Sequence, residues 1–192
     1  MVPAILLAAG ASERMGRPKA LLDAGGRTFV RRILDTLRDG GTTEIVVVVR
    51  PGAPDVVREV AAAGFARSVE NPDPDRGQLS SLLVGLDAVD GPAVTAVLVT
   101  LVDVPLVAPA TIAALLTRAA RSEAAILRAV HRGRHGHPVV FTRQVFAALR
   151  AADLGAGAKA VMHASVIEDV EVDDPGAVRD VDTPDDYARL LT

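Results

Sequence analysis

The chain has 192 residues, a formal net charge of −3 and no cysteine, and its length suits one α/β domain, residues 1–192, with a full core. Hydrophobic residues make up 49% of the sequence and aromatic residues only 3%, which favours a core of small aliphatic side chains and argues against stacking on single-stranded nucleic acid. The charge offers no basic field for duplex binding, and the lack of cysteine excludes disulfides, thiolate metal sites and a cysteine nucleophile.

Strand-like apolar runs alternate with helix-like stretches along the chain. The runs predicted as strands are residues 4–7, 44–49, 66–69, 93–100, 124–129 and 166–172. The stretches predicted as helices are residues 29–38, 55–63, 80–89, 109–121 and 143–151, with a last helix that starts after Thr183 as N-cap. The alternation indicates an α/β fold in three layers, a mostly parallel sheet covered on both faces. Residues 128–141 predict an antiparallel excursion.

A turn of small residues follows the first predicted strand. Residues 8–11 read Ala-Ala-Gly-Ala, and Arg14, Gly16 and Lys19 come after them. Gly10 can adopt a positive φ at no steric cost, and successive backbone N–H groups in such a turn form an anion-binding concavity. Since arginine and lysine add full positive charges, the segment predicts a site for a nucleoside triphosphate. An ordinary strand-to-helix turn with exposed basic residues is the alternative.

This turn differs from two commoner phosphate motifs. Five residues separate Gly10 and Gly16, where the P-loop has four, and Ser12 stands where the dinucleotide fingerprint has its second glycine. The segment Leu-Ala-Ala-Gly-Ala-Ser-x-Arg-Met-Gly-x-Pro-Lys, residues 7–19, is similar to the signature of nucleotidyltransferases that act on molybdenum cofactor and on sugar phosphates. The whole chain most resembles the molybdenum cofactor cytidylyltransferases of the molybdenum cofactor guanylyltransferase-like family. The resemblance implies their Rossmann-like nucleotidyltransferase fold.

A polar turn at Asn71 and residues 77–82 leads into a helix, which we expect Ser80 or Ser81 to cap. The turn resembles the family segment Gly-x-x-x-Ser-Leu, which lies along the nucleotide base and ribose. The resemblance therefore assigns Asn71, Ser80 and Ser81 to the nucleotide, and pure capping is the alternative. The arginine that often follows in the family is replaced, since Val84 stands two residues after the Ser-Leu pair.

Asp103 follows the apolar run 93–100, at the point where open α/β sheets bind ligands. A carboxylate on a loop stiffened by Pro105 suits Mg²⁺, which takes one or two carboxylates together with phosphate oxygens. Capping of the next helix is the alternative, but Pro109 is the expected first-turn residue there, so Asp103 lies early for a cap. The family motif reads Gly-Asp-Met-Pro; this chain keeps its aspartate and proline and has valine at the other two places.

Asp182 lies in the segment Asp-Val-Asp-Thr-Pro-Asp-Asp-Tyr near the end of the chain. Helix N-termini attract acidic residues, which accounts for Asp185 and Asp186 but not for Asp180 and Asp182. The segment resembles the family's terminal Asp-x-Asp-Thr-Pro-Glu-Asp block, whose second aspartate is a metal ligand. The resemblance therefore assigns Mg²⁺ to Asp103 and Asp182.

The segment 131–138 reads His-Arg-Gly-Arg-His-Gly-His-Pro. Three histidines suggest zinc, but two arginines among them would repel a cation, and a solvated basic hairpin is a further alternative. The family has Gly-His-Pro here, on a loop over the acceptor substrate. The resemblance therefore assigns His137, Arg132 and Arg134 to the acceptor's phosphate or pterin. Residues 153–159 resemble a family Gly-Asp-x-Gly-Ala-Arg block near the acceptor, with lysine in place of arginine.

The resemblance implies transfer of CMP from CTP to the terminal phosphate of a molybdopterin-type cofactor, with release of pyrophosphate. Lys19, Arg14 and Asp103 are the predicted catalytic residues. The residues assigned to the nucleotide are Leu7, Ala8, Ala9, Gly10, Arg14, Lys19, Asn71, Ser80, Ser81 and Asp103. Ala9 favours cytidylyl over guanylyl transfer, because the guanylyl branch has glycine there and Ala9 removes space that a purine needs. Mg²⁺ is the expected cofactor.

Three alternatives stay open: guanylyl transfer from GTP, NAD(P)H-dependent reduction of a pigment like that of nicotine blue oxidoreductase, and non-catalytic cofactor delivery. The missing Gly-x-Gly-x-x-Gly argues against the reductase, and two predicted metal ligands argue against the carrier. The apolar stretch after Met1 is too short to span a membrane. We expect a cytoplasmic protein whose partners are the nucleotide and the cofactor, with a molybdoenzyme or its chaperone as recipient and no binding to nucleic acid or membranes.

Overall fold

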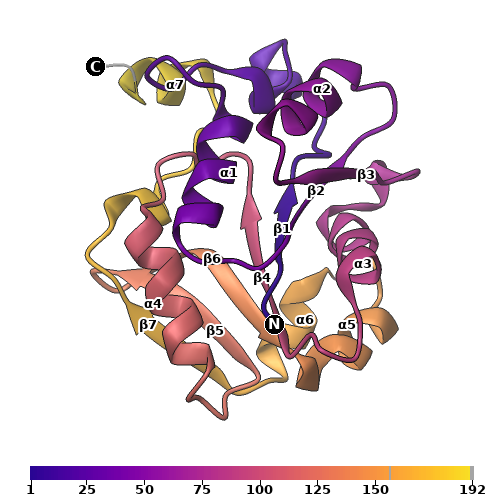
Figure 1. The fold of residues 1–192 in the computed structure, drawn as a ribbon, viewed down its shortest axis with the longest axis vertical. Helices are drawn as coiled ribbons and strands as arrows, with labels where there is room; N and C mark the ends of the chain where they lie inside the picture. Colours follow the sequence, from indigo (N-terminus) through magenta and orange to yellow (C-terminus); the bar gives the residue numbers. More distant parts are fainter. Residues whose placement is uncertain (156, 191–192) are drawn as a thin grey trace.

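The computed structural model describes residues 1–155 and 157–190 and contains a seven-stranded sheet with helices on both faces (Figure 1). The strand order is β3-β2-β1-β4-β6-β5-β7. The strands are β1 Ala4–Leu7, β2 Ile45–Val49, β3 Arg67–Glu70, β4 Ala96–Leu101, β5 Ile126–His131, β6 Arg134–Thr142 and β7 Ile167–Glu171. The helices are α1 Phe29–Asp39, α2 Pro54–Ala63, α3 Gln78–Val89, α4 Pro109–Ala119, α5 Phe146–Ala151, α6 Ala158–His163 and α7 Pro184–Leu190.

The sheet is parallel except at β6, which pairs antiparallel with β4 and β5. The predicted three-layer α/β fold and its antiparallel excursion are therefore confirmed. The carboxyl ends of β1 and β4 point to one edge of the sheet, where α7 and the loop after β1 also lie (top of Figure 1). None of the helices in the described part of the chain has the length and apolar character that a membrane span needs.

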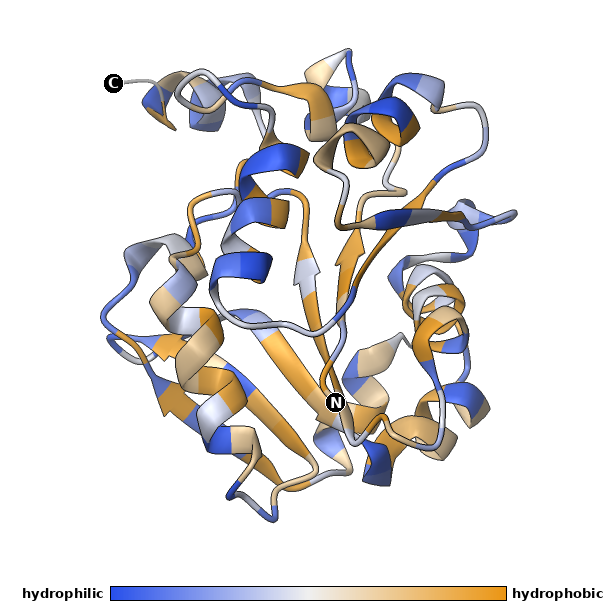
Figure 2. Ribbon diagram, in the orientation of Figure 1, coloured by the Kyte–Doolittle hydropathy of each residue, from blue (hydrophilic) through white to orange (hydrophobic). Residues whose placement is uncertain are grey.

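The strands supply core residues to both faces because successive side chains point to opposite sides. Ala4 and Leu6 pack with α1, α2 and α4, whereas Ile5 and Leu7 pack with α3, α5 and α6. The strands are accordingly almost continuously apolar, while the helices carry hydrophilic residues on their outer sides (Figure 2). Burial on both faces is typical of parallel sheets, and it fixes which loops meet at the carboxyl edge.

Two local predictions need correction. The helix after the polar turn begins at Gln78, and its N-cap is Gly77, at φ 96°, with no side-chain cap; the predicted capping by Ser80 or Ser81 is wrong, because both serines lie inside the first turns. The predicted helix 143–151 starts as a 3₁₀ turn and becomes α-helical only at Phe146. Helix α6 was not predicted, since its short segment has no long apolar period.

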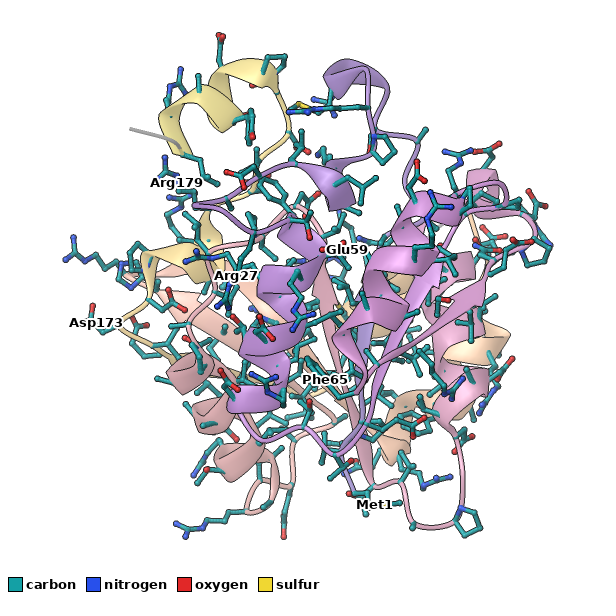
Figure 3. All side chains as sticks on the ribbon, turned by 45° about the horizontal axis from the view of Figure 1, so that its top comes forward. Met1, Arg27, Glu59, Phe65, Asp173 and Arg179 are labelled. Carbon is teal, nitrogen blue, oxygen red and sulfur yellow. The ribbon has the colours of Figure 1, made fainter. Side chains whose placement is uncertain are left out.

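Helix α1 is tied to α2 at its N-terminus. The Thr28 hydroxyl accepts a hydrogen bond from the Arg31 amide (3.2 Å) and donates one to Glu59 Oε1 (2.7 Å), which comes from α2. Figure 3 shows Glu59, which it labels, with Arg27 in this part of the molecule. Arg27 Nη1 in turn lies 2.9 Å from Asp35 Oδ2. The Thr28–Glu59 hydrogen bond joins the two helices on one face of the sheet, while the Arg27–Asp35 ion pair fixes the segment before α1 to that helix.

Gly85 allows α3 to lie directly on β1 and β2. A Cβ atom at this position would stand 2.4 Å from Ile5 Cγ2 and 3.0 Å from Val48 Cγ2. Both neighbours are branched side chains that are fully buried in the sheet. They cannot move aside without disturbing the strand that leads into the basic turn.

Replacing Gly85 with alanine should therefore lower the free energy of unfolding by about 1–3 kcal/mol, the usual effect of overpacking a core. Gly91→Ala is the matched control, because a Cβ there meets no atom within 4 Å, and its stability should stay close to that of the native protein. Urea denaturation of the three proteins measures the difference. Equal stability of Gly85→Ala and Gly91→Ala would contradict this description of the helix–sheet contact.

Candidate active site

The loop after β1 carries the predicted phosphate-binding residues. The Ala8 amide donates to Val48 O at 2.9 Å, so it belongs to the sheet, and backbone contacts to a phosphate would start at Ala9. Gly10 does not use the left-handed region that the sequence led us to expect; Ser12 (φ 53°) and Gly16 (φ 64°) do. A Cβ on Gly10 would meet no atom within 4 Å, which leaves its backbone accessible from the cleft.

Lys19 lies at the centre of the candidate site, between two carboxylates. Its Nζ is 2.5 Å from Asp182 Oδ1 and 3.7 Å from Asp103 Oδ2. The Lys19 amide donates to Ser12 Oγ at 3.1 Å, so the loop closes on itself and fixes the start of the lysine side chain. The structure thus brings together three residues that the sequence placed in separate motifs.

Asp182 is held by the start of α7. The Thr183 Oγ1 accepts from the Asp186 amide (3.2 Å) and Asp186 Oδ2 accepts from the Thr183 amide (2.9 Å), a reciprocal capping arrangement. This confirms Thr183 as N-cap. The Val181 amide donates to Asp103 O at 2.8 Å, so the segments that carry the two carboxylates are joined directly.

Asp103 is the electrostatically strained member of the cluster. Its Oδ1 is buried and has no hydrogen-bond partner among the residues that the structure describes. Burial raises the pKa of the Asp103 carboxyl, the Lys19 ammonium opposes this rise, and the charge of Asp182 adds to it. An ionised carboxylate with a free buried oxygen is a favourable ligand for a hard cation.

The cluster fits a metal ion that keeps other ligands besides the protein. No group of three or more histidine, cysteine or acidic residues able to hold a metal occurs among the described residues. Two carboxylates with one unsatisfied oxygen suit Mg²⁺ or Mn²⁺, which complete their coordination with substrate phosphates and water. Asp103 and Asp182 are the residues of this site that would hold such an ion.

A cleft of about 480 Å³ opens over this cluster. We call it the first cleft; its lining residues are Leu7, Ala9, Gly10, Ala11, Ser12, Arg14, Lys19, Pro74, Gly77, Gln78, Ser81, Leu101, Val102, Asp103 and Asp182. Most residues assigned to the nucleotide are among them. Asn71 and Ser80 are not, so any part that these two play in nucleotide binding would be indirect, and Ala8 lines a neighbouring hollow instead.

Asn71 supports the wall of the first cleft from behind. Its side-chain amide donates to Ser80 Oγ (2.9 Å) and to Ser81 Oγ (3.0 Å), and all three side chains are buried. The Ser80 hydroxyl donates to Gly77 O at 2.8 Å. This network fixes the polar turn and leaves Ser81 as the member that lines the cleft.

A second cleft of about 500 Å³ adjoins the first and shares Leu7, Gly77, Gln78 and Leu101 with it. We call it the second cleft. Its other lining residues are Leu79, Leu82, Val99, Arg128, His135, Gly136, His137, Val139, Phe141, Leu154, Gly155, Gly157, Ala158, Lys159 and Met162. A mostly apolar wall with a few polar groups is typical of a small-molecule site.

His137 lines the second cleft, as assigned, but the two arginines do not. Burial lowers the pKa of His137, and its Nδ1 has no hydrogen-bond partner. The Arg134 guanidinium donates to Val178 O (3.1 Å), and the Arg132 amide donates to Glu171. The histidines do not converge on a zinc site, since His131 Nδ1 lies 2.9 Å from Val172 O in the core.

Sequence reasoning missed Gln78, Arg128 and His135, which also line these clefts. Arg128 is a charged residue within an otherwise apolar strand, and His135 lies two residues before His137, hence on the same side of β6. These two signals were available in the sequence. Gln78 lies in the polar turn 77–82 that the resemblance assigned to the nucleotide, but no role was assigned to Gln78 itself, because only the course of α3 brings it to the junction of the clefts.

A basic turn follows the first strand, and two carboxylates face it in a cleft at the carboxyl edge of the sheet. This arrangement is typical of a nucleotide-binding α/β protein. Residues 4–170 match the MobA-like NTP transferase domain, and the chain belongs to this family of nucleotidyltransferases. The resemblance to the molybdenum cofactor guanylyltransferase-like family is therefore confirmed at the level of the family.

The chain is similar to several characterised relatives. It is 34% identical over 201 residues to nicotine blue oxidoreductase of Paenarthrobacter nicotinovorans, with 99% of this chain and 96% of that protein covered. A segment of 36 residues, 19% of this chain and 16% of that protein, is 56% identical to molybdenum cofactor guanylyltransferase of Rhizobium meliloti. The crystal structure of Rv0371c from Mycobacterium tuberculosis has a TM-score of 0.84 at 33% identity, covering 99% and 96% of the two chains. A structure of Rv0371c in complex with manganese has a TM-score of 0.78 at 31% identity, covering 99% and 97%.

Asp103→Asn should stabilise the protein at neutral pH, because burial raises the pKa of this carboxyl and penalises its charged form. A group whose pKa is higher in the folded state than in the unfolded state contributes fully to the stability of the fold at a pH below its unfolded-state pKa. It loses this contribution as the pH rises through its folded-state pKa. The gain from asparagine should therefore be absent near pH 3 and reach a few degrees in Tm at pH 7. Thermal unfolding across this pH range measures it.

Asp182→Asn is the control, because its carboxylate is more exposed and is the closer partner of Lys19. This variant should show no comparable gain. A lower Tm for Asp103→Asn than for the native protein at pH 7 would contradict the assignment of strain to Asp103.

Proposed function

We propose that the protein transfers CMP from CTP to the terminal phosphate of a molybdopterin-type cofactor and releases pyrophosphate. The observation that carries the proposal is the first cleft, where Arg14 and Lys19 face Asp103 and Asp182 beyond the ends of β1 and β4. In such a transfer, an oxygen of the acceptor phosphate attacks the α-phosphorus, and the bond from the α-phosphorus to the pyrophosphate oxygen breaks. No residue needs to form a covalent intermediate.

The residues of the first cleft would act by positioning and charge stabilisation. Arg14 and Lys19 bind the triphosphate and stabilise the charge that grows on the departing pyrophosphate. The backbone from Ala9 onward orients the phosphates. Asp103 and Asp182 hold a divalent ion, Mg²⁺ in this proposal, which supplies further neutralisation of phosphate charge when bound.

The second cleft is the site that we propose for the acceptor. It meets the first cleft at Leu7 and Gln78, so an acceptor seated there can present its phosphate end to the nucleotide. Because burial lowers the pKa of His137, its neutral ring suits a hydrogen bond to an uncharged heterocycle rather than an ion pair with phosphate. Lys159 and Arg128 bring positive charge to the same cleft. Arg132 and Arg134 would contact the acceptor only from outside this lining.

Reduction of a pigment by NAD(P)H is the second candidate, and the full-length similarity to nicotine blue oxidoreductase favours it. The two functions differ in their products. Incubation of the protein with each nucleoside triphosphate, Mg²⁺ and reduced molybdenum cofactor, with assays for pyrophosphate and for NAD(P)H oxidation, separates them. Pyrophosphate release that requires the acceptor would support transfer, and NAD(P)H oxidation without pyrophosphate would overturn it.

The cellular setting belongs to the same proposal. We propose a cytoplasmic enzyme, since the lack of cysteine fits a reducing compartment, and a molybdoenzyme or its chaperone as the recipient of the product. A pull-down of the protein with its product bound tests this step. The nucleotidyl transfer itself does not depend on which recipient takes the product.

CTP should be preferred over GTP with the same acceptor, because Ala9 lines the first cleft and its methyl group removes space that a purine needs. A steric difference of this kind is worth about 1–3 kcal/mol, or tenfold to a hundredfold in kcat/KM. Ala9→Gly should narrow the gap without improving the use of CTP. Competition assays with both nucleotides measure the ratio.

Ala11→Gly is the matched control, since it adds the same backbone freedom to the loop but at an exposed position. Its nucleotide ratio should stay near the native one. Equal use of CTP and GTP by the native protein would remove the cytidylyl assignment and leave nucleotidyl transfer in place.

A further inference from the structure

Lys19 occupies the space between the two carboxylates assigned to the metal. Its Nζ contacts Asp182 Oδ1 at 2.5 Å and lies 3.7 Å from Asp103 Oδ2, and 11% of its side chain is exposed. We propose that Lys19 keeps the metal position closed until a nucleoside triphosphate binds, so that the divalent ion enters together with the nucleotide. The inference rests on the proposed function, and it adds an order to the filling of the site.

The position between the carboxylates is unfavourable for Lys19 and a divalent ion together. Asp103 and Asp182 offer two negative charges there, with Asp180 as a further negative charge that acts on Asp103. The ammonium and a divalent ion placed between the same two carboxylates would lie within a few ångströms of each other, where like charges repel strongly in a partly buried site. The ammonium has to leave as the metal enters, and triphosphate oxygens are the acceptors that can take it.

The contacts of Asp103 show that the Lys19 ammonium does not satisfy both carboxylates. The separation of 3.7 Å between Lys19 Nζ and Asp103 Oδ2 is too long for a hydrogen bond, and Asp103 Oδ1 is buried without a partner. Leaving a buried acceptor unsatisfied is costly. A metal ion satisfies such an oxygen directly, so the site gains more from the metal than from the lysine once the ammonium has another partner.

The backbone is fixed while the ammonium has space to move. The Lys19 amide is bound to Ser12 Oγ, and Ala20 and Leu22 are anchored in the core. The exchange is therefore confined to the lysine side chain. Lys19 lines the first cleft and also a hollow of about 340 Å³ on the other side of the loop, so its ammonium can shift toward bound phosphates without a change in the fold.

Mn²⁺ binding with and without CTP, followed by the electron paramagnetic resonance signal of the free ion, tests the proposal. Without CTP, Lys19→Met should bind Mn²⁺ about tenfold or more tightly than the native protein, a usual size for coupling between sites. CTP should raise the Mn²⁺ affinity of the native protein by a larger factor than that of Lys19→Met. Lys159→Met removes the only other lysine of the chain and should leave Mn²⁺ affinity unchanged.

The outcomes distinguish this inference from the proposed function. One outcome overturns the closing role and leaves the metal site in place. In it, the native protein binds Mn²⁺ when CTP is present, but in the absence of CTP Lys19→Met binds Mn²⁺ no more tightly than the native protein does. If the native protein binds no Mn²⁺ even with CTP, or Asp182→Asn binds it as tightly as the native protein, the metal site itself is wrong and both proposals fail.

A measurement on the native protein keeps the test independent of how well Lys19→Met folds. Because lysine occurs only at positions 19 and 159, protein labelled with ¹³C at lysine Cε gives a resolved signal for Lys19, assigned with Lys159→Met. Mg²⁺ alone should leave this signal unchanged, and CTP with Mg²⁺ should shift it. A shift of the same size with Mg²⁺ alone would overturn the proposal.

Discussion

The parallel pairing of β1 and β4 is the constraint on which the site depends. Leu7 lies opposite Leu101 in this pair, so the loops that follow the two strands leave the sheet side by side. The first loop carries Lys19 and the second carries Asp103. Parallel strands buried on both faces have little freedom to change register, because a slip of one residue would exchange the residues of the two cores. The core packing therefore fixes the distance between the lysine and the carboxylate.

Asp182 completes the cluster from the far end of the chain, and its placement depends on the same pair of strands. The Val181 amide bonds to the carbonyl of Asp103, so the segment before α7 is held against the loop after β4. The helix cap at Thr183 then sets the direction of the chain. Because Lys19 and Asp182 are separated by 163 residues, their ion pair also ties the two ends of the chain together at the site.

The sequence predicted the elements well where one periodicity was clear, and less well where a contact depended on the course of the whole chain. Continuous apolar runs at β1, β2 and β4 placed the strands, and Thr183-Pro184 placed α7. The cap at Gly77 was missed because a glycine with positive φ has no side-chain signal. The resemblance placed Lys19, Asp103 and Asp182 at one site, but it did not predict that the ammonium lies between the two carboxylates, because each motif is consistent with many rotamers.

The electrostatics of the first cleft add information that the fold by itself does not give, since related folds host unrelated reactions. In this cleft two carboxylates share the Lys19 ammonium, and one oxygen of Asp103 is buried with no hydrogen-bond partner among the described residues. Such a pair is unfavourable for stability, because the charged form of Asp103 is disfavoured by its burial. A protein keeps an unfavourable charge where a ligand compensates for it. The metal ion and triphosphate proposed for this cleft would provide that compensation.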